Sequence, residues 1–215
     1  MHEQRVRPYS QYLLVKEGKP YWRLAALTEE AFCHILQPMM RKGSLFLEQK
    51  GYEVGLGDFH MVKQDSFQGL EERFWTGTDK VHHIDLEFLT SASFKRNGEY
   101  KIFPELPLVF NNLIRKWNVY SDSMILGEER LGDKLAESMC ITDYRLHTHP
   151  FSVEGRRIRA FRGNIRLGLF KDDITRRMAS MLAAFADYAG IGIKTAMGMG
   201  AVHSNIAYYQ KKEQL

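Results

Sequence analysis

Cysteine is scarce in this 215-residue chain, which contains only Cys33 and Cys140, far apart and outside any ligand-like spacing. Two such residues exclude a disulfide framework, and we expect both to be reduced thiols in the protein core. Long hydrophobic runs are missing as well, since no stretch approaches the roughly eighteen apolar residues of a membrane span. The first ten residues, MHEQRVRPYS, lack the apolar segment of a secretory signal. We therefore expect a cytoplasmic protein with no membrane partner.

The basic residues are concentrated in one stretch. The whole chain has a net charge of +4, and residues 141–170 carry the same net charge alone, with six arginines against two carboxylates. Such a cluster is the electrostatic footprint of a protein that binds a polyanion, although a solvated strand face is the alternative. The candidate binding residues are Arg145, Arg156, Arg157, Arg159, Arg162 and Arg166.

The first part of the chain predicts a hairpin followed by a helix. Residues 9–27 contain two β-like runs joined by KEGKP, which has the composition of a turn. Residues 28–43 repeat apolar side chains at helical spacing, and Thr28 is a suitable N-cap. Residues 52–62 predict a further strand, weakened by two glycines. The polar stretch 63–80 has no clear period, so we expect a connection there.

A second and more regular round of elements follows. The patterns predict a strand, a helix, two strands, a helix and a last strand, with an additional short helix at 127–138. The last long helix has the strongest signal, because acidic residues open it, an apolar stripe runs along it and Gly190 ends it. The six elements lie at 82–90, 107–118, 141–149, 156–170, 172–190 and 201–209.

A glycine-rich segment, GIGIKTAMGMG, follows that helix. It contains two glycine pairs, and a lysine stands between them. Phosphate loops and dinucleotide fingerprints lie between a strand and a following helix, whereas this loop precedes a strand, so both are excluded. A loop that binds an extended phosphate backbone remains, and a helix C-cap followed by a bulged strand is the alternative. The candidate residues are Gly190, Gly192, Lys194, Gly198 and Gly200.

Four motifs in order carry a family resemblance that covers nearly the whole chain. The glycine segment resembles the glycine-rich loop of the RAMP superfamily of CRISPR-associated proteins. Residues 86–118, AFRGNIRLGL at 160–169, and MHEQRVRPYSQYLL at 1–14 resemble segments of one family in it. That family is the CRISPR RNA-processing endoribonucleases, numbered six among the Cas families.

The resemblance implies an α+β fold of two tandem ferredoxin-like (RRM-like, βαββαβ) halves, which would occupy residues 1–80 and 81–215. RNA would bind across the two halves. The implied activity is cleavage of the CRISPR repeat without metal or cofactor, by attack of a ribose 2′-hydroxyl on the adjacent phosphate. The implied partner is CRISPR repeat RNA. A CRISPR effector complex is a second candidate partner, and the resemblance leaves open whether the chain forms a homodimer.

The resemblance also assigns two catalytic candidates. The family's catalytic histidine lies in a Leu-His pair shortly before a basic-Pro-aromatic-hydroxyl segment, and here Met-His precedes RPYS. His2 is therefore the implied acid or base, since an unperturbed histidine pKa of about 6.5 suits proton transfer near neutral pH. Arg7 is the implied cation facing the phosphate, because arginine cannot give up its proton. A cleavage-dead RNA-binding subunit is the alternative function.

The remaining histidines suggest no metal site. His82–His83 and His147–His149 lack the carboxylate or cysteine framework that metal binding requires. His203, which follows the glycine segment, is a distant second candidate for catalysis.

The resemblance finally predicts a further segment ahead of Met1. In the family, a strand and a helix precede the Leu-His pair, and the strand is central in its sheet. Loss of that strand would leave buried backbone groups unpaired. We therefore expect the native product to carry roughly 30–45 additional residues upstream. A tyrosine that is catalytic in some members belongs to that segment.

Overall fold

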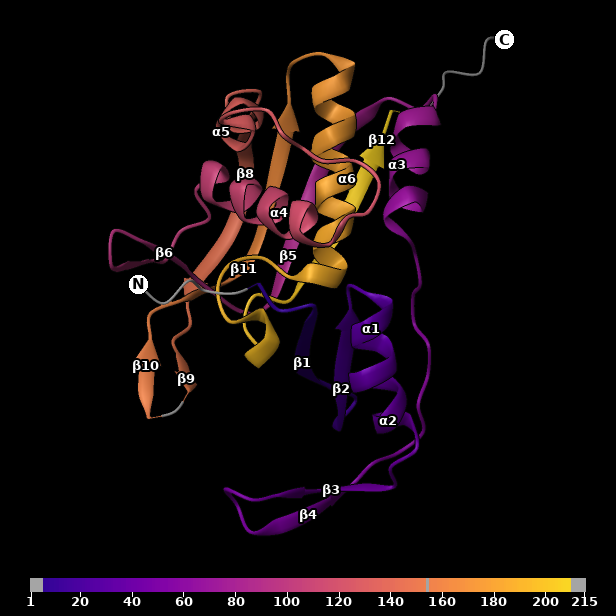
Figure 1. Ribbon diagram of the computed structural model, residues 1–215. Coiled ribbons are helices and arrows are strands. Elements are labelled where there is room, and N and C mark those ends of the chain that lie inside the picture. Colours follow the sequence, from indigo (N-terminus) through magenta and orange to yellow (C-terminus); the bar gives the residue numbers. More distant parts are fainter. Residues whose placement is uncertain (1–5, 154, 210–215) are drawn as a thin grey trace.

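A four-stranded antiparallel sheet organises the C-terminal half in the computed structural model, which describes residues 6–153 and 155–209 (Figure 1). The strand order is β12-β5-β11-β8, and helices α4 (Leu106–Tyr120) and α6 (Asp173–Ala189) cover one face. In chain order the elements are strand, helix, two strands, helix and strand, which is a complete ferredoxin-like unit. The strands are β5 (Val81–Ala92), β8 (Met139–Thr148), β11 (Phe161–Leu169) and β12 (Val202–Tyr208).

The core forms between this sheet and its two helices. Alternate residues of β5, such as Ile84 and Leu86, are buried, whereas Asp85 between them faces the open side of the sheet. Trp117 of α4 and Phe185 of α6 are fully buried and meet edge to face, with ring centroids 5.3 Å apart. The apolar stripes predicted for both helices therefore pack against the core, except for Ile174 in the first turn of α6, which is 62% exposed.

The C-terminal half also contains a short helix and two small hairpins. The predicted short helix exists as α5 (Leu131–Ala136), within the expected 127–138. Two hairpins extend from the sheet, one between β5 and α4 and one between β8 and β11. These hairpins are β6 (Phe94–Arg96) with β7 (Glu99–Lys101), and β9 (Phe151–Val153) with β10 (Arg156–Ile158). The expected strand at 156–170 is thus divided into β10 and β11.

The N-terminal half begins with the predicted hairpin, β1 (Tyr9–Lys16) and β2 (Lys19–Ala26). The helical segment follows as α1 (Glu29–Ala31), η1 (Phe32–Leu36) and α2 (Gln37–Met40), and the Thr28 hydroxyl accepts the Ala31 amide at 3.1 Å. The next strands are β3 (Ser44–Leu47) and β4 (Tyr52–Gly55), which form a separate hairpin. The strand expected at 52–62 therefore ends at Gly55, where its pairing with β3 ends.

The connection expected at 63–80 contains a helix, so that prediction is wrong. Helix α3 (Phe67–Thr76) has Ser66 as its N-cap, and the Ser66 hydroxyl accepts a hydrogen bond from the Gly69 amide. Leu70 and Phe74 are buried, and Phe67 meets the Trp117 ring at 4.9 Å. Its apolar positions do recur at helical spacing, but Gln, Glu and Arg side chains between them hide the period.

The prediction that both cysteines lie in the core is also wrong. Cys33 and Cys140 are exposed free thiols, on η1 and on the edge strand β8. In the part of the chain that the structure describes, no helix is long and apolar enough to cross a membrane.

Candidate nucleic-acid interface

The glycine segment forms a loop between α6 and β12, drawn in yellow in Figure 1. All four of its predicted glycines have positive φ, as does Lys194. Three glycines are required by contacts within the protein. A Cβ on Gly190, Gly192 or Gly200 would lie 2.0–2.8 Å from a backbone oxygen of the protein. Gly198 differs, since its nearest neighbour would be the Phe151 ring at 3.8 Å.

These distances make close packing of the protein itself the reason for three of the four glycines. Gly198 alone has room for a Cβ without a clash, so it is the glycine best placed for backbone contact with a ligand. RNA binding by the loop stays a prediction.

Helix α4 holds the first half of the loop through two side chains one turn apart. Asn112 accepts the Gly192 amide at 2.9 Å and donates to the Gly192 carbonyl at 3.4 Å. Lys116 donates to the carbonyls of Ala189 and Gly190 at 3.0 and 2.9 Å. The polar pair stands at i and i+4 inside an otherwise apolar stripe, and that spacing is a sequence signal that could have found it.

The end of β5, the residue that follows it and β1 hold the rest of the loop. The Ser93 carbonyl accepts the Ile193 amide at 3.0 Å, and the Ser91 carbonyl accepts the Gly200 amide at 2.8 Å. From the N-terminal half, the Gln11 side chain donates to the Ala196 carbonyl at 2.7 Å. The loop is therefore a fixed structure, anchored from both halves of the molecule.

Lys116 is a buried cation, with only 6% of its surface exposed. Burial, with a smaller contribution from the charge of Arg115, lowers the pKa of Lys116 to about 7. Its third contact is the Thr195 hydroxyl at 3.4 Å. Lys116 is not among the predicted site residues, because a lysine on a helix is usually solvated.

The β9–β10 hairpin packs against the glycine loop through a small apolar cluster. Ile158 and Met199 are fully buried in it, and Phe151 and Ile193 pack around them. The arginines of the hairpin point away from this cluster into solvent. Exposed Arg156 and Arg157 lie on β10, and exposed Arg159 follows it. Within residues 6–153 and 155–209, no ion pair involves these three side chains.

The other three predicted arginines lie on the open face of the sheet, opposite α4 and α6. Arg145, Arg162 and Arg166 line a hollow of about 490 Å³ that three carboxylates also line. Arg166 donates to both carboxylate oxygens of Asp85, at 2.7 and 3.1 Å. This hydrogen bonding is the main cause of the lowered pKa of Asp85. The hairpin arginines form no ion pair with another described residue, so the hairpin is the more cationic of the two surfaces.

Of the two catalytic candidates, His2 lies outside the described residues. Arg7 is exposed and lies at the C-terminal end of α4, where the Tyr120 hydroxyl donates to the Val6 carbonyl. Burial raises the pKa of Tyr120, and the nearby charge of Arg7 partly opposes the shift. Tyr120 is one helical turn beyond Lys116, so α4 fixes both the Arg7 segment and the glycine loop.

The histidines considered for a metal site make other contacts. The His149 Nδ1 lies 2.7 Å from the Ser91 hydroxyl, and the His82 and His83 Nδ1 atoms are 2.6 Å apart. In the described part of the chain, no three His, Cys, Asp or Glu residues gather as metal ligands would. His203 is exposed on β12, with Nδ1 3.7 Å from Asp187.

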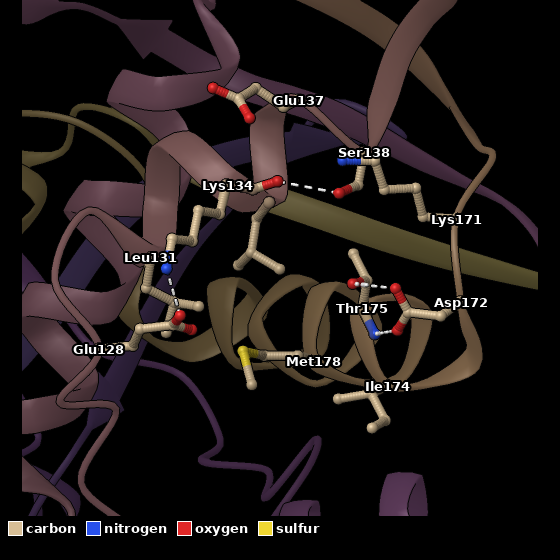
Figure 2. Close-up of a pocket in the computed structure, with 11 residues that line it drawn as sticks. Glu128, Leu131, Lys134, Glu137, Ser138, Lys171, Asp172, Ile174, Thr175 and Met178 are labelled. Atoms are coloured by element: carbon tan, nitrogen blue, oxygen red, sulfur yellow. Dashed lines mark hydrogen bonds and ion pairs between the residues drawn. The ribbon is translucent and has the colours of Figure 1, made fainter.

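A separate pocket lies at the far end of α6 (Figure 2). It has a volume of about 260 Å³ and lies between α5 and the first turns of α6. In it, Asp172 caps the helix by accepting the Thr175 amide, and Lys134 pairs with Glu128. Met178 is the last residue of α6 that lines the pocket, and it is about 18 Å along the helix from Gly190, where the glycine loop begins. The pocket is therefore not part of the candidate interface.

A ferredoxin-like sheet, a rigid glycine loop and a basic hairpin beside it define a class of α+β protein with a surface suited to a phosphate backbone. More specifically, the chain belongs to the CRISPR-associated endoribonuclease Cas6 family, whose sequence model matches residues 86–202. The predicted family is thereby confirmed, and three of the four motifs lie within the matched residues.

Two curated relatives match over most of the chain. A CRISPR-associated endoribonuclease Cas6 from Streptococcus thermophilus is 28% identical over 212 residues, which cover 94% of this chain and 82% of that protein. One with the same description from Mycobacterium tuberculosis is 29% identical over 213 residues. That alignment covers 94% of this chain and 64% of the mycobacterial protein.

Solved structures with the same fold confirm the predicted fold class. A Cas6 product complex superimposes with a TM-score of 0.78 at 21% identity, covering 95% of this chain and 84% of that one. Cas6 of Thermus thermophilus gives a TM-score of 0.69 at 20% identity, covering 94% and 81%. At this level of identity the likeness concerns the fold.

Proposed function

We propose that this chain is an endoribonuclease that cuts CRISPR repeat RNA in the precursor transcript to make guide RNAs for antiviral defence. Family membership carries the proposal, because the matching model and both relatives are described as CRISPR-associated endoribonucleases. The chemistry of the surface supports it. A rigid loop in which Gly198 is half-buried, and three exposed arginines that form no ion pair with another described residue, suit the phosphates of an RNA strand.

The proposed reaction is a metal-independent transesterification within the RNA. The ribose 2′-oxygen loses its proton and bonds to the adjacent phosphorus, while the bond from phosphorus to the 5′-oxygen breaks and that oxygen takes up a proton. The products are a 2′,3′-cyclic phosphate and a 5′-hydroxyl. His2 is the proposed proton-transfer group. Arg7 is the proposed cation that stabilises the charge developing on the phosphoryl oxygens.

The test is incubation of end-labelled repeat RNA with the full chain in EDTA. We expect cleavage at one position, with a cyclic phosphate on the upstream fragment. A requirement for a divalent cation would contradict metal independence. RNA binding without any product at any pH would instead favour a non-catalytic repeat-binding subunit of the RAMP superfamily.

The hairpin arginines are expected to bind RNA through its phosphates. Replacing Arg157 and Arg159 with alanine removes two cations, so fewer counterions are released on binding. The slope of log affinity against log salt concentration should become less steep by about 1.4–1.8 units, and affinity should fall. Filter binding over a range of salt concentrations measures both quantities.

The matched control is Arg130→Ala with Lys134→Ala on the far side of the molecule. It removes the same charge from two side chains that pair with Asp133 and Glu128. This double variant should keep the wild-type slope. An unchanged slope in the hairpin variant would show that Arg157 and Arg159 do not contact RNA.

A further inference from the structure

Lys116 is a buried ammonium whose hydrogen-bond partners are all uncharged. They are the carbonyl oxygens of Ala189 and Gly190 and the hydroxyl of Thr195. Among the described residues, no carboxylate forms an ion pair with Lys116. A buried charge without a counter-charge is costly, and proteins normally pair such a group or neutralise it.

The charged groups on the surrounding elements do not supply the missing negative charge. Arg115, on the same helix, repels Lys116. Lys194 in the loop and Arg7 at the end of α4 are also cations. The one buried carboxylate of α6, Asp187, already binds Lys63 at 2.9 Å and the Ser204 amide at 2.7 Å. The phenols at this end of α4 and α6, Tyr120 and Tyr188, have raised pKa values and are neutral near pH 7.

The Lys116 ammonium lies at the C-terminal end of α6, where a positive charge offsets the partial negative charge of the helix end. Ala189 and Gly190 end α6, where the unpaired carbonyls of a helix carry a partial negative charge. An anion approaching the glycine loop would meet this negative end. The Lys116 ammonium binds those same carbonyls and therefore offsets the repulsion.

We propose that Lys116 is an inner cation of the RNA-binding surface, and that an RNA phosphate on the outer side of the glycine loop supplies its missing counter-charge. Binding of RNA then takes up a proton at Lys116. The inference rests on the proposed function, because it requires RNA on this loop. Lys116 touches the loop and not the RNA, so it is a positioning residue.

The proposal fixes the direction of the pH dependence. In the free protein the Lys116 pKa is about 7. A nearby phosphate favours the ammonium form, so the pKa in the complex is higher. Below the free pKa both states are protonated and affinity does not depend on this group. Above it, RNA affinity falls by up to about tenfold per pH unit, until the pKa of the complex is reached.

The experiment measures the dissociation constant of the full chain for repeat RNA with a 2′-deoxy substitution at the cut, so that nothing is cleaved. The pH range of about 7.5–9 lies above the ordinary histidine pKa, so histidines contribute little there. Wild-type affinity should fall about tenfold or more over this range. Lys116→Met should bind more weakly than wild type at about pH 7.5, with a flat profile. Lys116→Arg keeps the charge at every pH and should also be flat.

Proton uptake by the wild type alone gives a second readout that needs no folded variant. Calorimetry at about pH 8, in buffers of different ionisation enthalpy, should show close to one proton bound per RNA. Equal pH profiles for wild type and Lys116→Met, or no proton uptake by the wild type, would overturn this inference and leave the proposed function standing. A wild-type chain that binds no repeat RNA at any pH would overturn the proposed function, and this inference with it.

Discussion

Replacing His2 with alanine is expected to slow repeat cleavage by about 100- to 10,000-fold, the usual contribution of a positioned acid or base. RNA affinity should change by less than about threefold, because the predicted binding contacts lie in the hairpin and the glycine loop. Single-turnover cleavage with the chain in excess measures the first quantity, and filter binding with 2′-deoxy RNA measures the second. The difference between the two effects identifies a residue that acts in the transition state.

The comparison variant is His203→Ala. His203 follows the glycine segment and is the second histidine considered for catalysis. This variant should cleave at close to the wild-type rate. A large loss of cleavage in His203→Ala, with His2→Ala unaffected, would move the acid–base role to the open face of the sheet. Arg7→Lys should retain more activity than Arg7→Ala if charge facing the phosphate is what Arg7 supplies.

The C-terminal half was largely predictable because its elements carry strong local signals. Alternation in 82–90 and the apolar stripe with acidic start and glycine stop in 172–190 each lie within one window of sequence. The register shift in β11 between Phe161 and Gly163 likewise lies at a single glycine. At Gly163, φ is +129°, and a Cβ would lie 1.9 Å from the Arg145 carbonyl oxygen.

The contacts that build the site were not predictable, because they join residues far apart in the chain. Lys116 meets Gly190 across 74 residues, and Gln11 meets Ala196 across 185. A local pattern shows that a lysine interrupts an apolar stripe, but it does not show which carbonyls the lysine reaches. The same limit applies to Cys140, whose exposure depends on its pairing with Gly168 of β11, which puts it on the open face of the sheet.

Substitution of two neighbouring glycines by valine should separate the structural role of the glycine loop from its proposed role in RNA binding. Both positions have positive φ, +97° at Gly198 and +65° at Gly200, so both variants have backbone strain of about 1–2 kcal/mol. Only the space around them differs. A Cβ on Gly200 would lie 2.0 Å from the Ile191 carbonyl oxygen, a backbone atom that cannot move aside without opening the loop.

Gly200→Val should therefore lower the free energy of unfolding by about 3 kcal/mol or more, since overpacking adds to the strain. Gly198→Val should lower the free energy of unfolding only by the backbone strain of about 1–2 kcal/mol, because its Cβ meets nothing closer than the Phe151 ring. If RNA lies against the loop, Gly198→Val should nevertheless bind repeat RNA at least about tenfold more weakly, because the branched side chain occupies the space of the phosphate backbone. Denaturant unfolding and filter binding on the same preparations give both quantities. Global unfolding of Gly198→Val would show that this glycine also serves the fold, and unchanged RNA affinity in a folded Gly198→Val would show that RNA does not approach the loop there.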